Sequence, residues 1–386
     1  MTPPTTPDAV LRQCEALLDA DSEGVQASIA ERILAGYRGL EEAGRRTVLI
    51  GLGRPLDPVP AAVVAAASAW DHAQTPERLQ ALLRATKPPR RELLRRLHLA
   101  HGATRALVDL RRDLLVALGD EPDLQRVDLD LRFLLRSWFT REFLELRRID
   151  WTTPAFVLER IATNEAVHEV SDWLDLRARV RPSDRRCYGF FHPAMPDEPL
   201  IFVMVALTDT LPTTIASVLE THRDALPEQD ATMAVFYSIS NCQPGLRGVS
   251  LGNFLIKQVA ATIAADLPQV TTFCTLSPIT GLAGWTDEPA EDPAAQAAAY
   301  LVRARRDDGQ PLDPVARFHL GNGAILDRIL PDADPSPRGM QRAFGTMCSY
   351  RYDLDHVADN HHVYATDRTI VTGPAVDALL RRAAGR

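Results

Sequence analysis

Residues 234–277 carry the feature that most constrains the fold of this chain. β-Branched and aromatic residues at 234–240 predict a strand, and a second strand is predicted at 270–276. Between them, three glycines precede residues 253–264, where apolar side chains recur at the spacing of an amphipathic helix. A strand, a glycine-rich turn, a helix and a strand in this order predict an α/β unit.

The glycine-rich turn has the layout of a phosphate-binding site. Glycine at 245, 248 and 252 allows backbone N–H groups to converge on an anion, and the following helix directs the positive end of its dipole to the same place. Arg247 adds a cation. The turn contains neither G-x-G-x-x-G nor G-x-x-x-x-G-K-[ST], which argues against a dinucleotide or Walker-type site. A purely structural turn is the alternative, since glycine also serves close packing.

The first part of the chain is predicted to be all-α. Helical periodicity interrupted by proline and glycine runs from residue 8 to about residue 148, and Thr75 followed by Pro76 is typical of a helix start. Further helices are predicted at 90–99, 103–118 and 128–146. These patterns favour a helical bundle.

Strand patterns begin after Trp151. Besides the two strands above, strands are predicted at 188–191 and 200–207, and helical patterns at 212–219 and 294–305 separate them. We therefore expect a boundary near Asp150. The predicted domains are a helical bundle over residues 1–150, expected to mediate oligomerisation, and a mixed α/β domain over residues 151–386.

Composition narrows the class of protein. The 386-residue chain has a formal net charge of -8, which argues against a dedicated nucleic-acid binder. No apolar stretch approaches the roughly 20 residues of a membrane helix, and the N-terminus lacks a signal pattern, so we expect a cytoplasmic protein. The five scattered cysteines are expected to be reduced thiols, with inter-subunit disulfides as the alternative. Basic pairs such as Arg90 and Arg91 are expected on a solvated helix face.

Two residues stand where catalytic side chains are often found. Ser277 follows the second strand of the α/β unit and precedes Pro278, and His319 precedes a Gly-Asn-Gly turn. Each also has a structural interpretation, as a helix cap or turn residue for Ser277 and as a core histidine for His319. The polar segment 355–362 contains ligand-type side chains, but a loop or helix start has the same composition, and we predict no metal site.

Two levels of resemblance sharpen these expectations. The turn Arg247-Gly-Val-Ser-Leu-Gly252 resembles the R/Q-x-x-G-x-G/A loop with which GNAT acetyltransferases hold the pyrophosphate of coenzyme A. A wider set of motifs is similar to the malonyl-CoA decarboxylase family and appears in family order between residues 140 and 352. These motifs are Phe143-Leu-Glu-Leu-Arg-Arg-Ile-Asp-Trp151, Arg185-Arg-Cys-Tyr188, the glycine turn with its helix, Leu276-Ser-Pro-Ile279, Phe318-His-Leu-Gly-Asn-Gly323 and Tyr350-Arg-Tyr352.

The resemblance implies a fold and a reaction. It implies an acetyltransferase-like catalytic domain after the helical bundle, and decarboxylation of malonyl-CoA to acetyl-CoA and CO2 in fatty acid metabolism. His319 would be the proton donor, and Ser277 its hydrogen-bonding partner or a proton acceptor. No separate cofactor is expected, because coenzyme A is part of the substrate, and a homo-oligomer, tetramer or dimer, is expected. The residues implied in coenzyme A binding are Arg247, Gly248, Val249, Ser250, Leu251, Gly252 and Asn253.

The chain departs from the family pattern in two places. Ser250 stands where the acetyltransferase loop has glycine and where some decarboxylases have glutamate, which removes one group that could orient the histidine. The segment between Ser277 and His319 is shorter than in longer family members, so methylmalonyl-CoA stays open as a substrate. Two other functions also stay open, a coenzyme A-dependent N-acyltransferase and a non-enzymatic coenzyme A-binding scaffold.

Overall fold

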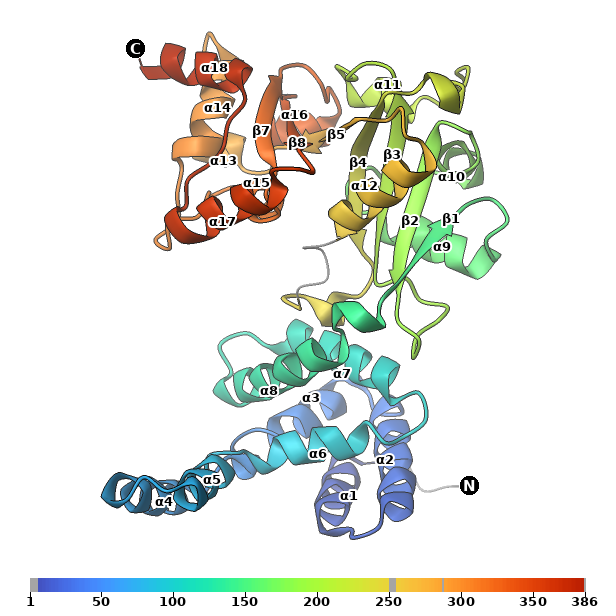
Figure 1. Cartoon of the computed structure of the whole chain (residues 1–386). Helices are drawn as coiled ribbons and strands as arrows, with labels where there is room; N and C mark the ends of the chain where they lie inside the picture. Colours follow the sequence, from blue (N-terminus) through green and yellow to red (C-terminus); the bar gives the residue numbers. More distant parts are fainter. Residues whose placement is uncertain (1–5, 250–254, 287, 385–386) are drawn as a thin grey trace. The chain divides into compact units, whose positions relative to one another are not determined.

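The structure is a computed structural model that describes residues 6–249, 255–286 and 288–384. The chain forms two compact units (Figure 1). The helical unit contains residues up to Leu144 together with His192–Pro196 and the turn at 243–250. The α/β unit contains Glu145–Phe191, Asp197–Cys242 and the rest of the chain from residue 251. The glycine-rich turn therefore belongs to the helical unit, although the strand before it belongs to the α/β unit.

The helical unit is a bundle with an apolar core. Leucines dominate that core, and Leu17, Leu93, Leu107, Leu114 and Leu131 are fully buried in it. The elements in chain order are α1 (Pro7–Asp19), α2 (Glu23–Arg38), α3 (Glu42–Gly51), η1 (Arg54–Leu56), α4 (Pro60–His72), α5 (Pro76–Ala85), α6 (Pro89–Leu97), α7 (Ala103–Ala117), α8 (Pro122–Trp138) and η2 (Arg141–Phe143). The predicted all-α character is confirmed as far as η2, whereas the last predicted residues of this region belong to a strand.

Local signals define some helix ends and miss others. The Thr75 side chain accepts a hydrogen bond from the Arg78 N–H and α5 begins at Pro76, as predicted. The prediction of one helix over 128–146 was wrong. α8 begins at Pro122 and ends at Trp138, and residues 145–149 form the first strand of the sheet instead. Pairing of that strand with its neighbour overrides an apolar spacing that would also suit a helix.

The expectation of a solvated face at Arg90 and Arg91 was also wrong. Arg90 is only 2% exposed, and its guanidinium donates to Asp130 at 2.7 Å and to the Gly53 carbonyl at 2.7 Å. Asp130 is fully buried and also accepts from Arg91 at 2.5 Å. Because each charge has a partner and further hydrogen bonds, this buried cluster is electrostatically satisfied.

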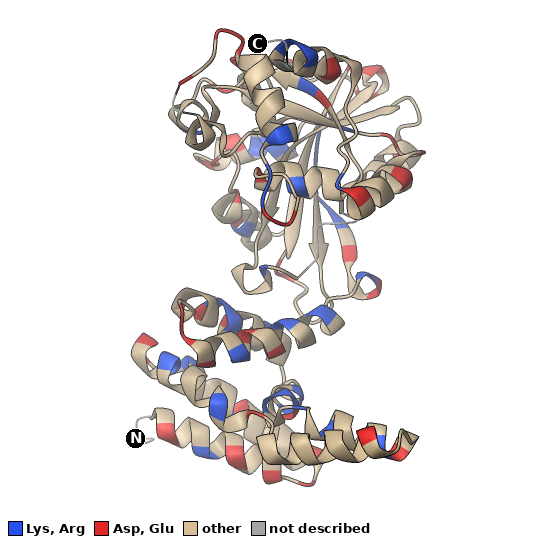
Figure 2. Cartoon of the chain, turned by 90° about the vertical axis from the view of Figure 1, so that its left-hand side faces the viewer, with Lys and Arg blue, Asp and Glu red and all other residues tan. Residues whose placement is uncertain are grey.

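Helices α4 and α5 form a hairpin that extends from the rest of the helical unit (Figure 1). Neither helix contains a buried residue, and the ribbon of α4 carries almost no charge (Figure 2). Residues 42–72 are long and apolar enough, by composition, to cross a membrane. In the structure this span is divided into α3, η1 and α4, with lengths of 10, 3 and 13 residues, and neither α-helix alone has the roughly 20 residues of a span.

The α/β unit is built on a mixed sheet. Within the described residues the sheet has eight strands in the order β1-β2-β3-β4-β5-β8-β6, with β7 also paired to β8. All pairings are antiparallel except that of β4 with β5. The strands are β1 (Glu145–Ile149), β2 (Arg185–Phe191), β3 (Ile201–Thr208), β4 (Met233–Asn241), β5 (Thr272–Thr275), β6 (Ser277–Pro278), β7 (Ile325–Leu330) and β8 (Met347–Tyr352).

Helices surround this sheet in the α/β unit (Figure 1). The helices are α9 (Ala155–Asn164), α10 (Trp173–Val180), α11 (Ile215–Leu219), η3 (Glu228–Asp230), α12 (Leu255–Asp266), α13 (Leu282–Trp285), α14 (Pro293–Arg303), α15 (Pro314–Gly321), α16 (Pro337–Ala343), α17 (Val357–Asp367) and α18 (Pro374–Ala384). All four predicted strands are present, and so are the helices predicted near residues 212–219 and 294–305. The five cysteines are free and buried, as expected for reduced thiols.

The expected strand, turn, helix and strand are β4, the turn at 243–249, α12 and β5. β4 and β5 pair in parallel only from Met233 to Phe236, with one further bond from Leu276 N–H to the Phe236 carbonyl at 3.0 Å. β4 then continues to Asn241 beside β3, whereas the chain after β5 enters β6 and pairs with β8. The two parallel strands therefore part at Ser277.

Candidate active site

Ser277 lies in a short strand, neither a helix cap nor a turn. β6 consists of Ser277 and Pro278, which pair with Cys348 and Met347 of β8. The Ser277 side chain is 5% exposed. Its hydroxyl donates a hydrogen bond to Oγ1 of Thr275 at 2.8 Å, and the same Thr275 oxygen accepts from the Tyr350 N–H at 3.0 Å. The hydroxyl of Ser277 is thus fixed by the sheet.

His319 projects from the last turn of α15. Asp313 begins this helix, because one oxygen of its carboxylate accepts from the N–H groups of Val315 and Ala316. The other oxygen accepts from the N–H and the hydroxyl of Thr280, each at 2.8 Å. Since Thr280 follows β6 closely, Asp313 ties the helix that carries His319 to the segment that carries Ser277.

The two predicted catalytic side chains meet inside the α/β unit. Ser277 Oγ lies 3.2 Å from His319 Nε2, and His319 is 4% exposed. The other ring nitrogen, Nδ1, lies 2.8 Å from the hydroxyl of Tyr352. The ring of Tyr350 stacks on the imidazole, with centroids 4.6 Å apart and planes inclined by 20°. Both nitrogens and one face of the imidazole are therefore held by protein groups.

Burial keeps this cluster neutral. Desolvation lowers the pKa of His319 from 6.5 to about 3, because the charged imidazolium loses its hydration without gaining a counter-ion. Burial likewise raises the pKa of Tyr352 well above its ordinary value. At neutral pH the pair is thus a hydroxyl and a neutral imidazole, joined at Nδ1 to a neutral phenol. Such a cluster can donate and accept protons but holds no permanent charge.

Sequence reasoning missed three of these contacts. Tyr352 was named only as part of a family motif, and Thr275 and Asp313 were given no role. An Asp-Pro pair before a helical pattern is a recognisable N-cap signal, so Asp313 could have been placed at a helix start. The Thr275 and Tyr352 contacts depend on β5, β6 and β8 lying side by side, and no local pattern reports that pairing.

The glycine-rich turn is described in part. η4 (Pro244–Leu246) leads into Arg247, which is exposed, and Gly248, which has a φ of +76° that favours glycine. The N–H groups of Arg247 and Val249 are used within the turn, on the carbonyls of Pro244 and Leu246. The other residues implied in coenzyme A binding lie outside the described residues, namely Ser250, Leu251, Gly252 and Asn253.

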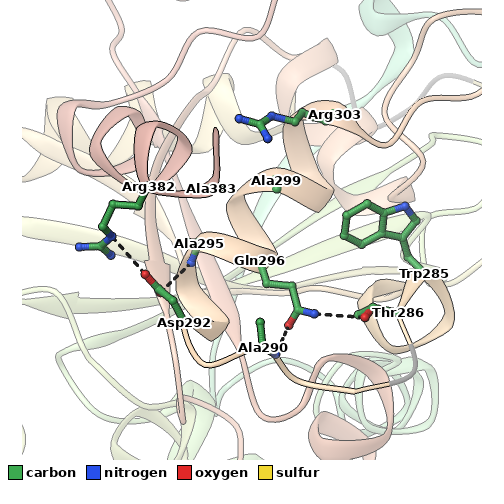
Figure 3. Close-up of a pocket in the computed structure, with 10 residues that line it drawn as sticks. All are labelled: Trp285, Thr286, Ala290, Asp292, Ala295, Gln296, Ala299, Arg303, Arg382 and Ala383. Carbon is green, nitrogen blue, oxygen red and sulfur yellow. Dashed lines mark hydrogen bonds and ion pairs between the residues drawn. The ribbon is translucent and has the colours of Figure 1, made fainter. Parts of the chain in front are cut away.

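A groove of the α/β unit is lined by residues other than the Ser–His pair. It has a volume of about 430 Å³ and lies between α13, α14 and α18 (Figure 3). Its polar side chains bind one another. Gln296 accepts from the Ala290 N–H and donates to Thr286, and Arg382 pairs with Asp292 at 3.1 Å.

The polar segment 355–362 forms the start of a helix. His356 occupies the N-cap position of α17 without a capping hydrogen bond from its side chain, and its Nδ1 lies 3.1 Å from a carboxylate oxygen of Asp353. Within residues 6–249, 255–286 and 288–384, no group of three or more His, Cys, Asp or Glu side chains is placed to hold a metal ion.

Comparisons with known proteins give the family. The sequence-family model of the malonyl-CoA decarboxylase N-terminal domain matches residues 56–139. The family model of the C-terminal domain matches residues 142–296 and 291–386. Mitochondrial malonyl-CoA decarboxylase of Anser anser anser is 36% identical over 85% of this chain and 78% of its own length. The Rattus norvegicus enzyme of the same name is 32% identical over 98% of this chain and 89% of its own length.

Solved structures agree over nearly the whole chain. Malonyl-CoA decarboxylase from Rhodopseudomonas palustris is 43% identical and superposes with a TM-score of 0.91, covering 97% of this chain and 100% of its own. The enzyme from Cupriavidus metallidurans is 33% identical with a TM-score of 0.76, covering 97% and 99%. This chain therefore belongs to the malonyl-CoA decarboxylase family.

Proposed function

We propose that this protein decarboxylates malonyl-CoA to acetyl-CoA and CO2, with Ser277 and His319 at the reacting carbon. The observation that carries the proposal is the buried, neutral Ser–His pair, whose imidazole is held at both nitrogens. Membership of the malonyl-CoA decarboxylase family supports malonyl-CoA as the substrate. No Gly-x-Ser-x-Gly motif surrounds Ser277, so an acyl-serine intermediate is not part of the proposal.

The reaction requires the protein to hold the substrate, to polarise its thioester carbonyl and to return a proton to C2. The malonyl carboxylate is β to a thioester carbonyl, so the C–C bond can break with its electron pair passing into an enolate while CO2 leaves. Hydrogen-bond donors aimed at the thioester oxygen stabilise that enolate. The Ser277 hydroxyl and the His319 imidazole are the candidate groups at this site, because both are shielded from water and fixed by neighbours.

His319 is proposed to supply the proton at C2. The lowered pKa makes it neutral in the free protein. A malonyl carboxylate bound next to the ring would raise that pKa, because an opposite charge favours the imidazolium. Loss of CO2 removes the carboxylate charge and leaves an enolate, which takes the proton from the imidazolium at C2. Ser277 would hydrogen-bond the carboxylate or accept from the imidazolium Nε2–H.

The coenzyme A portion is proposed to bind at two features of the chain. The turn at Arg247–Val249, with the residues that follow it, would hold phosphate groups. The edge of β4 from Tyr237 to Asn241, where β5 no longer pairs, offers backbone groups to the amides of a pantetheine arm. Coenzyme A is then part of the substrate, and no separate cofactor is proposed.

We also propose that the protein is a homo-oligomer, a tetramer or a dimer, and that the α4–α5 hairpin contacts a second copy. Both helices lack buried residues and present large apolar side chains at Val59, Val64, Leu79 and Leu83. Such a surface favours a protein partner. A second copy of the chain offers the same apolar surface in return.

An assay of the purified protein tests the reaction. Malonyl-CoA is supplied without any acceptor, and acetyl-CoA and CO2 are quantified. Equal amounts of both products support the proposal. Turnover that appears only when an amine is added would instead indicate an N-acyltransferase. Binding of coenzyme A with no turnover under either condition would indicate a scaffold.

A further inference from the structure

Within the helical unit, the glycine-rich turn is packed against α7 by close backbone contact. A Cβ atom at Gly245 would lie 2.0 Å from the carbonyl oxygen of Val108 in α7, so only glycine fits there. Arg111, also in α7, is 1% exposed and donates hydrogen bonds to the turn. Its guanidinium donates to the carbonyls of Gly245 at 2.7 Å and Arg247 at 2.8 Å, and its Nε donates to Asp128 at 2.8 Å.

Two further arginines of the helical unit lie beside Gly248. Arg136 donates to the Gly248 carbonyl at 3.2 Å, and Cδ of Arg132 lies 3.8 Å from the position of a Cβ at Gly248. Both belong to α8, four residues apart, so their side chains share one face of the helix. Arg247 precedes Gly248 in the turn and is exposed, so three arginines are neighbours of this glycine in space or in sequence.

These three charges differ from the other arginines of the same helices. In α7 and α8, Arg105 and Arg112 pair with Asp109, Arg111 pairs with Asp128, and Arg126 pairs with Asp57. Within the part of the chain that the structure describes, Arg132, Arg136 and Arg247 have no carboxylate within ion-pair distance. Because like charges repel, such a group in a chain of net charge -8 indicates a site for an anion.

We propose that Arg132 and Arg136, on the helical unit, bind phosphate groups at the nucleotide end of coenzyme A. The inference rests on the proposed function for the identity of the ligand. Guanidinium groups suit this role because they donate two parallel hydrogen bonds to a phosphate. The helical unit then has a part in substrate binding as well as its proposed part in assembly.

Binding of phosphate-bearing and phosphate-free probes tests the inference in the full-length protein. Arg132→Gln and Arg136→Gln are titrated with coenzyme A, with adenosine 3′,5′-bisphosphate and with pantetheine. Each variant should bind the two nucleotides about tenfold more weakly, as expected for the loss of one charge-assisted hydrogen bond. Pantetheine should bind as it does to the wild type.

The control is Arg126→Gln, which removes the same charge from the same helix at a position paired with Asp57 and Asp123. It should leave nucleotide affinity within about twofold of the wild type. Wild-type affinity in the Arg132→Gln, Arg136→Gln double variant, or an equal loss in Arg126→Gln, would overturn the inference. Because the probes need no turnover, a protein that binds them through these arginines but releases no CO2 would refute the proposed reaction and leave this inference standing.

A kinetic measurement separates phosphate binding from catalysis. With malonyl-CoA, the double variant should raise KM and leave kcat within about twofold, since the arginines do not touch the reacting atoms. With malonyl-pantetheine, which lacks the nucleotide, the variant and the wild type should have equal kcat/KM. A fall in kcat/KM on malonyl-pantetheine would contradict a role confined to the phosphates.

Discussion

At the scale of single residues, the candidate site is defined by how completely His319 is held. Its Nε2 contacts Ser277, its Nδ1 contacts Tyr352, and its face stacks on Tyr350. The three partners come from β6 and β8, which pair with each other. The sheet register therefore decides the position of the imidazole, and each contact can be tested by one substitution.

Tyr352→Phe should slow turnover without weakening substrate binding. The substitution removes the hydrogen bond at His319 Nδ1 and keeps the ring, so kcat should fall about tenfold, the equivalent of about 1.4 kcal/mol. KM should change little. The matched control is Tyr350→Phe, because the Tyr350 ring stacks on the imidazole while both imidazole nitrogens are bonded to Ser277 and Tyr352. Equal losses of kcat in the two variants would argue against a special role for Tyr352.

The buried imidazole also predicts how stability depends on pH. The pKa of His319 is about 3 in the folded protein and 6.5 when exposed, so between these values only the unfolded state binds the proton. The free energy of unfolding should therefore fall as the pH drops below about 6.5, by up to about 1.4 kcal/mol per pH unit from this residue. Urea unfolding at pH 7, 6, 5 and 4 measures the slope. His319→Asn should give a shallower slope, and parallel curves would contradict the assignment.

At the scale of elements, the strand–turn–helix–strand unit could be predicted because each part has its own local signal. β-Branched residues mark β4, glycines mark the turn, and the apolar period marks α12. The end of α8 could not be predicted, since residues 139–146 keep an apolar spacing and only pairing of Glu145 with Phe191 makes the last of them a strand. Likewise, Ser277 and His319 were suggested by motifs, but their contact follows from Asp313 joining α15 to Thr280.

Asp313→Ala tests that junction. Loss of the α15 cap and of both hydrogen bonds from Thr280 should lower the free energy of unfolding by about 2–3 kcal/mol. It should also lower kcat, because the helix that carries His319 loses its tie to the Ser277 segment. Asp172→Ala is the control, since Asp172 caps α10 through the N–H groups of Leu174 and Asp175 and is exposed. The control should lose about 1 kcal/mol and keep its kcat. An unchanged kcat in Asp313→Ala would show that the junction only stabilises the fold.

At the scale of the whole molecule, the two units have distinct contents. The α/β unit contains the Ser–His pair, and the helical unit contains the glycine-rich turn, the arginines beside Gly248 and the exposed α4–α5 hairpin. The sequence patterns indicated a helical part and a sheet part, but not that the turn after β4 packs with the helices. That grouping depends on the hydrogen bonds of Arg111, which lies 134 residues from Gly245 in the chain.

The proposed assembly can be tested on the α4–α5 hairpin. Val64→Glu with Leu83→Glu places charges on side chains that are 66% and 62% exposed, so the isolated chain should fold normally. Sedimentation equilibrium should then give a lower mass than the wild type. Val116→Glu, at a 77% exposed position of α7, is the control and should keep the wild-type mass. A monomeric wild type, or an unchanged mass in the hairpin variant, would contradict the proposal.

The rate of CO2 release by His319→Asn, measured beside its affinity for coenzyme A, tests the central claim most directly. If His319 returns the proton to C2, the variant should release CO2 about 100-fold more slowly or worse while binding coenzyme A as the wild type does. The control is His222→Asn. His222 is exposed and its ring is hydrogen-bonded to the Thr221 hydroxyl, so this variant should retain full activity. A His319→Asn protein that keeps wild-type turnover, or that loses activity only in proportion to its affinity for coenzyme A, would contradict the account.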